Sequence, residues 1–274
     1  MKNHLNIFFP QWQGGGKDKS TYAGAVEIKK NYLRNRNFRD VEISLEEDYR
    51  IQNGIIGYQP IVNQVKRCRE LIRQEQPASI FTIGGGCDIA IAPISYLNSV
   101  ADLTVLWFDA HGDLNTPETS ASKAFHGMPL RTLLGEGDSE ILQQTFSRLA
   151  PSQIILLGSR DLDDAETQYI ERVNIDLFKV EYLEADPNCL LAAMKAKEVK
   201  KLYIHIDLDV LDPVEFPFVP VPAVGGLTIP TLLRLLKILP AQFPILGLSL
   251  AEYRASGRGK IEIMEEIINL GVAL

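Results

Sequence analysis

Two short polar segments follow apolar stretches of the chain and carry residues suited to metal chemistry. The first is Asp-Ala-His-Gly-Asp at 109–113, directly after the apolar run at 103–108. If the extended backbone of a strand continues through this segment, Asp109, His111 and Asp113 project to one side. Two carboxylates and an imidazole that converge in this way form half of a divalent-metal site.

The second segment places Asp207 and Asp209 after the apolar stretch at 202–206. Burying isolated carboxylates among Ile and Leu costs much desolvation free energy, and a bound metal ion removes that cost. Either segment alone is also typical of exposed aspartates in a loop. Two such clusters favour metal, because four carboxylates near one point cannot all stay ionised without cations between them. The sequence therefore predicts two divalent ions, which together ionise a water and hold it against a planar or trigonal electrophile.

Short apolar strand candidates alternate with longer helical patterns along the chain, which predicts βα units around one mostly parallel sheet. We expect strands at residues 5–9, 41–44, 78–83, 103–109, 153–157, 175–178, 202–206 and 244–248. We expect helices at 23–34, 61–74, 89–98, 139–149, 190–197, 229–239 and 260–270, with Thr228 as the N-cap of the helix that opens at 229. The fold class is then α/β, a three-layer αβα arrangement around a central sheet of about eight strands. Ligands of such sheets bind beyond the carboxyl ends of the strands, which is where both polar segments fall.

The composition limits the class of protein. The chain has 274 residues, 46% hydrophobic and 23% charged, which suits a single large α/β domain over 1–274. The net charge of −7 argues against nucleic acid or an anionic membrane as a partner and is compatible with a cationic small substrate. No apolar run approaches the ~20 residues of a membrane span. The three cysteines, Cys68, Cys87 and Cys189, are widely spaced, which argues against a disulfide framework and favours the cytoplasm.

The segment at 109–129 resembles the central signature of arginases, which belong to the ureohydrolase family of binuclear manganese enzymes. It reads Asp-Ala-His-Gly-Asp-Leu-Asn-Thr-Pro-Glu-Thr-Ser-Ala-Ser-Lys-Ala-Phe-His-Gly-Met-Pro. The blocks at 158–163, 205–213 and 225–228 resemble further family blocks in the same order and spacing. The dispersed Asp and His pattern is shared by all ureohydrolases, whereas Asn-Thr-Pro-x-Thr-x-x-Ser before His126 resembles arginase more narrowly.

The resemblance implies roles for the metal-binding residues and for one histidine. Asp109 and Asp207 would bridge two divalent ions, for which the family implies manganese. Asp113 would complete the protein ligands of the first ion, and His111 with Asp209 those of the second. His126 would be the catalytic histidine that shuttles protons and helps the leaving amine depart; without the motif, a histidine that caps a local helix is the alternative.

The resemblance also implies how a small cationic guanidino substrate would be held. Three residues match positions that bind the α-carboxylate of the substrate: Asn115, Ser120 and Ser122. Asp163 matches the carboxylate that reads the α-amino group, with Glu166 behind it. Glu252 matches the carboxylate that anchors the guanidinium, a pairing that fixes both the plane and the charge of the substrate.

The implied activity is the hydrolysis of L-arginine to L-ornithine and urea through a hydroxide that bridges the metals, in a homo-oligomer of three or six chains. Two alternatives remain open. The protein could act on another guanidino or formimino compound, or it could be a metal-poor homologue that binds a ligand without catalysis.

The motif departs from the family most clearly at Cys87, within Ile-Gly-Gly-Gly-Cys-Asp at 83–88, where the family has a metal-binding histidine. A thiolate ligand disfavours manganese and favours zinc, iron or cobalt. Cys87 could instead remain a neutral buried thiol, with Asp88 or a water as the ligand. In a third interpretation, Cys87 is only a small buried residue at a tight turn, and the first metal is weakly bound or missing.

Three further departures surround the expected site. His205 stands where a serine is usual, and it could lie behind the metal ligands or simply pack. Val221 replaces a threonine near the guanidinium, which removes a hydrogen bond. Arg254, two residues after Glu252, could compete for that anchoring carboxylate.

Overall fold

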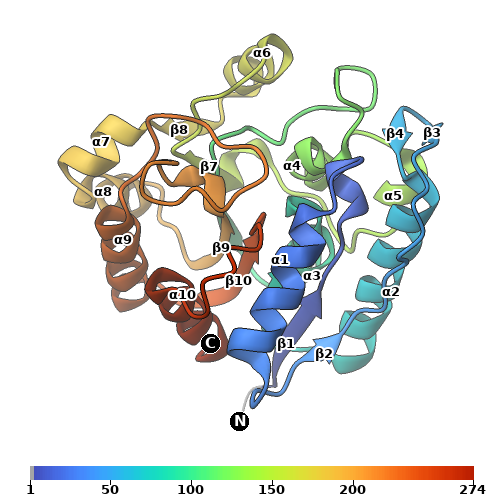
Figure 1. Cartoon of the computed structure of the whole chain (residues 1–274). Coiled ribbons are helices and arrows are strands. Elements are labelled where there is room, and N and C mark those ends of the chain that lie inside the picture. Colours follow the sequence, from blue (N-terminus) through green and yellow to red (C-terminus); the bar gives the residue numbers. More distant parts are fainter. Residues whose placement is uncertain (1–2) are drawn as a thin grey trace.

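The computed structural model describes residues 3–274. Eight strands form one sheet in the order β2-β1-β5-β10-β9-β6-β7-β8, with helices on both sides (Figure 1). All neighbouring strands in this sheet run parallel. The strands are β1 (His4–Phe9), β2 (Arg39–Asp40), β5 (Ser79–Gly84), β6 (Leu103–Phe108), β7 (Ile154–Leu157), β8 (Asp176–Phe178), β9 (Lys201–Asp207) and β10 (Ile245–Ala251). The predicted three-layer αβα fold is confirmed.

Alternate residues of each strand point to opposite faces of the sheet and build two separate cores. One core packs against α1 (Ser20–Ile28), α7 (Val180–Ala185), α8 (Asn188–Ala196), α9 (Ile229–Gln242) and α10 (Glu262–Val272). The other packs against α2 (Tyr58–Glu75), α3 (Ile91–Val100), α4 (Pro129–Leu133) and α6 (Asp164–Val173). A third, small cluster joins α2 to α5 (Ser139–Leu142), close to the hairpin of β3 (Ile51–Gln52) and β4 (Ile55–Ile56).

Local sequence explains where the long helices form. In α2 the buried side chains Ile61, Val65, Cys68 and Ile72 recur every three or four residues, which places them on one face. At the start of α9 the Thr228 hydroxyl accepts a hydrogen bond from the Thr231 amide at 3.3 Å, so the predicted N-cap is confirmed. None of the helices within 3–274 combines the length and apolarity needed to cross a lipid bilayer.

Two predicted elements are wrong, one in position and length and the other in length. The strand expected at 41–44 is instead β2, which is two residues long and lies at the edge of the sheet, where only β1 pairs with it. The helix expected at 139–149 ends at Leu142, because the following chain turns to contact other elements. Leu149, for example, donates its amide to the Leu133 carbonyl at 2.8 Å.

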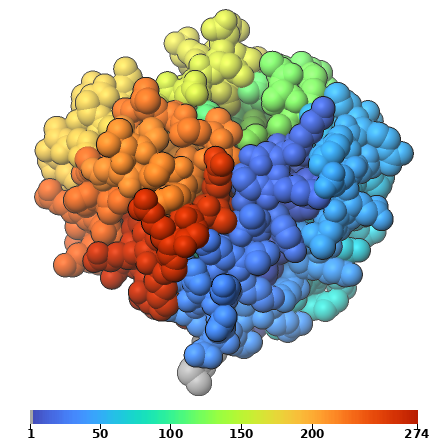
Figure 2. All heavy atoms as spheres, in the orientation of Figure 1, coloured from blue at the N-terminus to red at the C-terminus, as the bar shows by residue number. Residues whose placement is uncertain are grey.

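The two ends of the chain lie side by side, the blue and red regions of Figure 2. The carboxylate of Glu27 in α1 accepts hydrogen bonds from the Tyr253 hydroxyl at 2.6 Å and the Gly257 amide at 2.9 Å. Gly24 makes this approach possible, because a Cβ there would lie 1.7 Å from the carbonyl oxygen of Tyr253. The contact therefore holds the segment after β10, which carries Glu252, against α1.

We predict that Gly24→Ala lowers the free energy of unfolding by about 2 kcal/mol, because the new methyl group forces α1 away from Tyr253. Urea denaturation followed by circular dichroism would measure the loss. Gly15→Ala is the matched control, because no atom lies within 4 Å of its added Cβ. Equal stability of the two variants would contradict the prediction.

Candidate active site

The candidate site lies at the carboxyl ends of the four central strands. In the order β5, β10, β9 and β6, these strands are neighbours in the sheet. Cys87 begins the short 3-10 turn after β5, and Glu252 directly follows β10. Asp207 is the last residue of β9, and Asp109 directly follows β6. Parallel pairing therefore brings four polar side chains from distant parts of the sequence to one edge.

These residues surround a cavity of about 280 Å³. Its lining includes ten of the predicted site residues: Cys87, His111, Asp113, Asn115, Ser122, His126, Asp163, Glu166, Asp207 and Asp209. Glu252, also predicted, lines it as well, together with Val221. Of the remaining two predicted residues, Asp109 lies fully buried beside the cavity, while Ser120 is buried and is not among its lining residues.

Asp109, His111 and Asp209 converge, although not by strand alternation. The strand β6 ends at Phe108, so the expectation that the extended backbone continues through 113 is wrong. The His111 Nδ1 atom lies 3.0 Å from Asp209 Oδ2 and 3.4 Å from Asp109 Oδ1. Asp113 reaches the cavity through a left-handed backbone with φ of 53°.

Asp207 and Asp209 are held by a tight turn rather than by a continuing strand. Asp209 lies in the 3-10 turn Leu208–Val210 and donates its amide to Asp207 Oδ1 at 2.8 Å. Asp209 Oδ1 accepts a hydrogen bond from the Ala110 amide at 3.0 Å, which ties the Asp209 carboxylate to the turn after β6. The turn after β6 thus helps to position the Asp209 carboxylate of the turn after β9.

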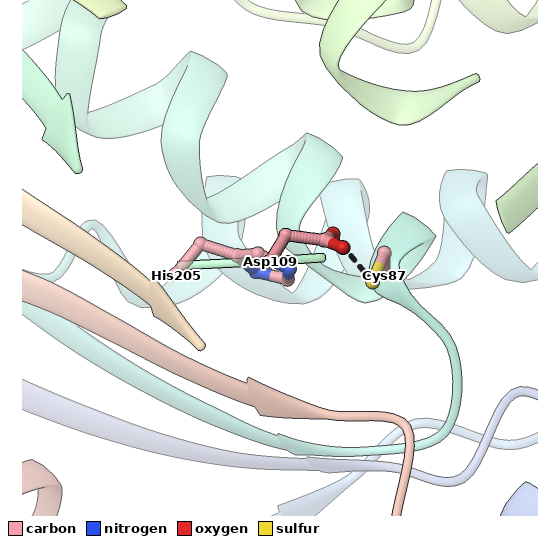
Figure 3. Close-up of side chains that lie close together, drawn as sticks. All are labelled: Cys87, Asp109 and His205. Carbon is pink, nitrogen blue, oxygen red and sulfur yellow. Dashed lines mark hydrogen bonds between the residues drawn. The ribbon is translucent and has the colours of Figure 1, made fainter. Parts of the chain in front are cut away.

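The Cys87 thiol lies among these carboxylates. Its Sγ atom is 3.1 Å from Asp207 Oδ2 and 3.9 Å from Asp109 Oδ2, the second contact being drawn in Figure 3. The alternative ligand Asp88 belongs to none of the candidate metal-binding groups within 3–274 and does not line the cavity. Burial raises the pKa of the Asp88 carboxyl to about 7. Position therefore favours the thiol over Asp88 as the donor.

The acidic cluster fits divalent cations. Burial, and then the charge of Asp209, raises the pKa of Asp109 to about 6. Burial and neighbouring carboxylates also raise the pKa values of Asp113 and Asp207 well above their ordinary range. The buried Oδ2 atom of Asp113 has no hydrogen-bond partner among the described residues. Bound cations would relieve both the crowded charge and this unpaired oxygen.

Glu252 and His126 form a second polar pair at the cavity. His126 Nδ1 lies 3.3 Å from Glu252 Oε1, which also accepts the Cys87 amide at 3.3 Å. Glu252 adopts a left-handed backbone with φ of 57°, which turns the chain sharply after β10. Its Oε2 atom is buried and has no partner within 3–274. Arg254 is exposed, and no ion pair between it and Glu252 occurs in that range, so the expected competition is not found.

A polar loop and the start of α6 close the opposite side. Asn115 Nδ2 donates to Asp163 Oδ2 at 2.7 Å, while Asp163 Oδ1 caps α6 by accepting the Glu166 amide at 2.9 Å. Glu166 in turn accepts the Leu114 amide at 3.1 Å, and burial raises the pKa of Glu166 to about 7. The Ser122 hydroxyl faces the same cavity. These contacts fix the loop that carries Asn115 relative to α6.

Sequence reasoning missed the residue that braces the turn after β9. The Arg160 guanidinium donates to six backbone carbonyls, those of Gly158, Asp209, Val210, Leu211, Ala223 and Val224. The motif at 158–163 marked Arg160 as part of a family block, yet nothing in the sequence shows which carbonyls it reaches. Trp107 was missed likewise, although its indole Nε1 donates to Asp109 Oδ2 at 3.0 Å.

The parallel sheet and its buried acidic edge define the class of metal-dependent hydrolases, and comparison with known proteins narrows it. The sequence model of a protein family, described as "Arginase family", matches residues 18–257 of this chain. An arginase of Staphylococcus aureus is 35% identical over 224 residues, covering 76% of this chain and 72% of the relative. The chain therefore belongs to the arginase family, whose enzymes are binuclear metal hydrolases that cleave carbon–nitrogen bonds.

Solved structures support the same fold. The Entamoeba histolytica arginase, solved with L-ornithine, superposes with a TM-score of 0.87 at 21% identity, covering 100% of this chain and 99% of that one. The Bacillus caldovelox arginase superposes with a TM-score of 0.84 at 23% identity, covering 100% of this chain and 97% of that one.

We predict that the imidazole of His126 titrates above its ordinary value of 6.5. Burial is the largest single influence and lowers its pKa, but the hydrogen bond to Glu252 and the negative charges of Glu252 and Asp88 together raise it by more. Glu252→Gln should therefore lower the pKa of His126. Histidine-selective NMR would follow the titration, with His126→Asn to assign the resonance. The same pKa in the wild type and in Glu252→Gln would contradict the prediction.

Proposed function

We propose that this protein hydrolyses L-arginine to L-ornithine and urea, with divalent metal ions as cofactor. One observation carries the proposal. The carboxylates that suit metal ions and the unpaired carboxylate oxygen of Glu252 surround a single cavity of about 280 Å³. A cationic substrate bound by Glu252 would therefore lie next to the metal-binding residues.

We propose that Asp109 and Asp207 hold both ions, with Cys87 and Asp113 on the first and His111 and Asp209 on the second. Divalent ions at such a site lower the pKa of a coordinated water and balance the charge of the carboxylates. The family implies manganese. The buried thiol of Cys87 favours a softer ion, such as zinc, iron or cobalt.

Glu252 would bind the guanidinium. Its Oε1 atom already accepts hydrogen bonds, whereas the buried Oε2 atom has no partner within residues 3–274 and would gain one from an N–H group of the substrate. A carboxylate and a guanidinium form a charge-assisted pair that also sets the orientation of the substrate plane. Because Glu252 is buried, little water competes for this contact.

His126 would supply the proton that the leaving amine needs. Its raised pKa keeps a larger fraction of the ring protonated near neutral pH than an ordinary histidine would have. The side chain is 24% exposed and faces the cavity, so it can exchange protons with solvent between turnovers.

Asn115 and Ser122 would bind the α-carboxylate, and Asp163 would bind the α-amino group, supported by Glu166. Asn115, Ser122 and Asp163 are within reach of a substrate because they line the cavity. Ser120 is buried and accepts the Lys123 amide at 3.0 Å, so we propose that it shapes the loop rather than touching the substrate directly.

A different guanidino or formimino substrate is the second candidate. It is favoured by Val221, which lines the cavity and offers no side-chain hydrogen bond to the substrate. An apolar side chain at this position would select a guanidinium over other substrate groups less strongly than a hydroxyl that hydrogen-bonds the guanidinium.

We further propose that residues 1–274 fold as one domain and that the protein is a cytoplasmic homo-oligomer of three or six chains. Three free cysteines support the compartment. Light scattering of the purified protein would measure the assembly, and the mass of one chain would contradict it. Cell fractionation would test the location, and two separate unfolding transitions would argue against one domain.

We predict that the protein, supplied in turn with manganese, cobalt, nickel, zinc or iron, releases urea from arginine. His126→Asn should lose most of this activity, by about 10²-fold or more, because the proton donor is gone. A panel of other guanidino and formimino compounds tests the second candidate. No urea with any metal would contradict the arginine assignment. Inactivity on the whole panel together with one or no bound metal would indicate a non-catalytic homologue.

A further inference from the structure

His205 is a fully buried histidine, and one of its two ring nitrogens makes no hydrogen bond to the described residues. On β9 it lies two residues before Asp207, hence on the same face of the sheet and one step deeper beneath the site. Its Nδ1 atom is 2.7 Å from Ser249 Oγ, whereas its Nε2 atom has no hydrogen-bond partner within residues 3–274. A buried polar atom without a partner costs about 1–3 kcal/mol, so it calls for an explanation.

The neighbours of His205 hold the ring in one orientation. Strand pairing places Trp107 of β6 on one side of it and Ser249 of β10 on the other. The Trp107 ring stacks on the imidazole with centroids 3.7 Å apart and planes 22° apart. With the ring proton assigned to Nδ1, where it is donated to Ser249, Nε2 keeps its lone pair. This is how a hydrogen bond fixes the tautomer of a metal-binding histidine.

The ring lies next to two donors of different chemistry. One ligand atom each of His205, Cys87 and Asp109 lie within 4.8 Å of one another, and all three residues are buried. Figure 3 shows the His205 ring close to Asp109, whose carboxylate points towards the Cys87 sulfur.

The two departures from the resembled motifs are therefore neighbours in space. By the resemblance of the motifs, Cys87 in the turn after β5 takes the place of a histidine, and His205 on β9 takes the place of a serine. An imidazole is lost from the turn after β5 and another is gained on β9, near the same carboxylate.

We propose that His205 is a metal ligand, and that Cys87, Asp109 and His205 together bind the first divalent ion of the centre. The proposal rests on the metal centre of the proposed function and adds a ligand to it. Nitrogen, sulfur and carboxylate oxygen donors suit zinc, cobalt or iron better than manganese. On binding, the Cys87 thiol gives its proton to solvent and bonds as the thiolate.

Histidine-selective ¹⁵N NMR of the whole protein, before and after adding Zn²⁺, tests the proposal without depending on activity. We expect the Nε2 resonance of His205 to move on metal binding while the ring stays neutral. His205→Gln assigns that resonance. If this variant does not fold, His4→Gln, His111→Asn and His126→Asn assign the other three histidines, and His205 follows by elimination.

Zn²⁺ affinity gives a second measurement. His205→Gln and Cys87→Ser should each weaken the binding of one zinc equivalent by at least about 10-fold. His4→Gln and Cys68→Ser are matched controls, since His4 and Cys68 lie outside the cavity and outside the candidate metal groups. Unchanged resonances of His205 in the zinc-bound wild type would overturn the proposal, as would wild-type affinity in a folded His205→Gln.

The outcomes also separate this inference from the proposed function. Zinc binding through His205 without urea release would leave the ligand assignment standing and remove the arginine activity. Urea release with metal but no response of the His205 resonance would support the arginine activity and overturn the ligand assignment.

Discussion

The site depends on one constraint, the burial of several acidic groups at the carboxyl edge of the sheet. Asp109, Asp113, Asp207 and Asp209 are all nearly inaccessible to solvent. Among the residues described, His111 is the one cationic side chain paired with Asp109 or Asp209. Burial and mutual repulsion raise the pKa values of Asp109, Asp113 and Asp207, so without cations the cluster favours partial protonation. The turns after β6 and β9, the hydrogen bond from the Trp107 indole and the Arg160 guanidinium, which braces the turn after β9, hold these carboxylates close together.

The sequence predicted the architecture well, because burial on both faces leaves a strong signal. The apolar runs of β6 and β9, each followed by aspartates, predicted both the parallel sheet and the edge where a site forms. Short edge elements were harder. The backbone of β2 is fixed by pairing with Ile7 and Phe8 of β1, and no local pattern contains that information.

At the candidate site the sequence predicted which residues gather but not how they do so. Asp113 and Glu252 adopt left-handed backbones, a conformation that costs free energy for such residues and that only tertiary contacts determine. The surroundings of His205 were also hidden, because Trp107 and Ser249 become its neighbours only through the strand order. Asp109 and Asp207, by contrast, follow from one rule, that parallel strands end together.

The strand order has a consequence for how the chain is made. The last strand in sequence, β10, lies between β5 and β9 near the middle of the sheet. A ribosome-bound chain that lacks residues 245–251 can pair β1 with β5 and β6 with β9, but these two half-sheets have nothing between them. Each exposes an unpaired strand edge, and the Cys87 turn after β5 stays apart from the aspartates that follow β6 and β9. The aspartates that follow β6 and β9 can therefore meet once β9 has formed, whereas Cys87 and Glu252 join them only after β10 is inserted, so the last strand of the sheet completes the site.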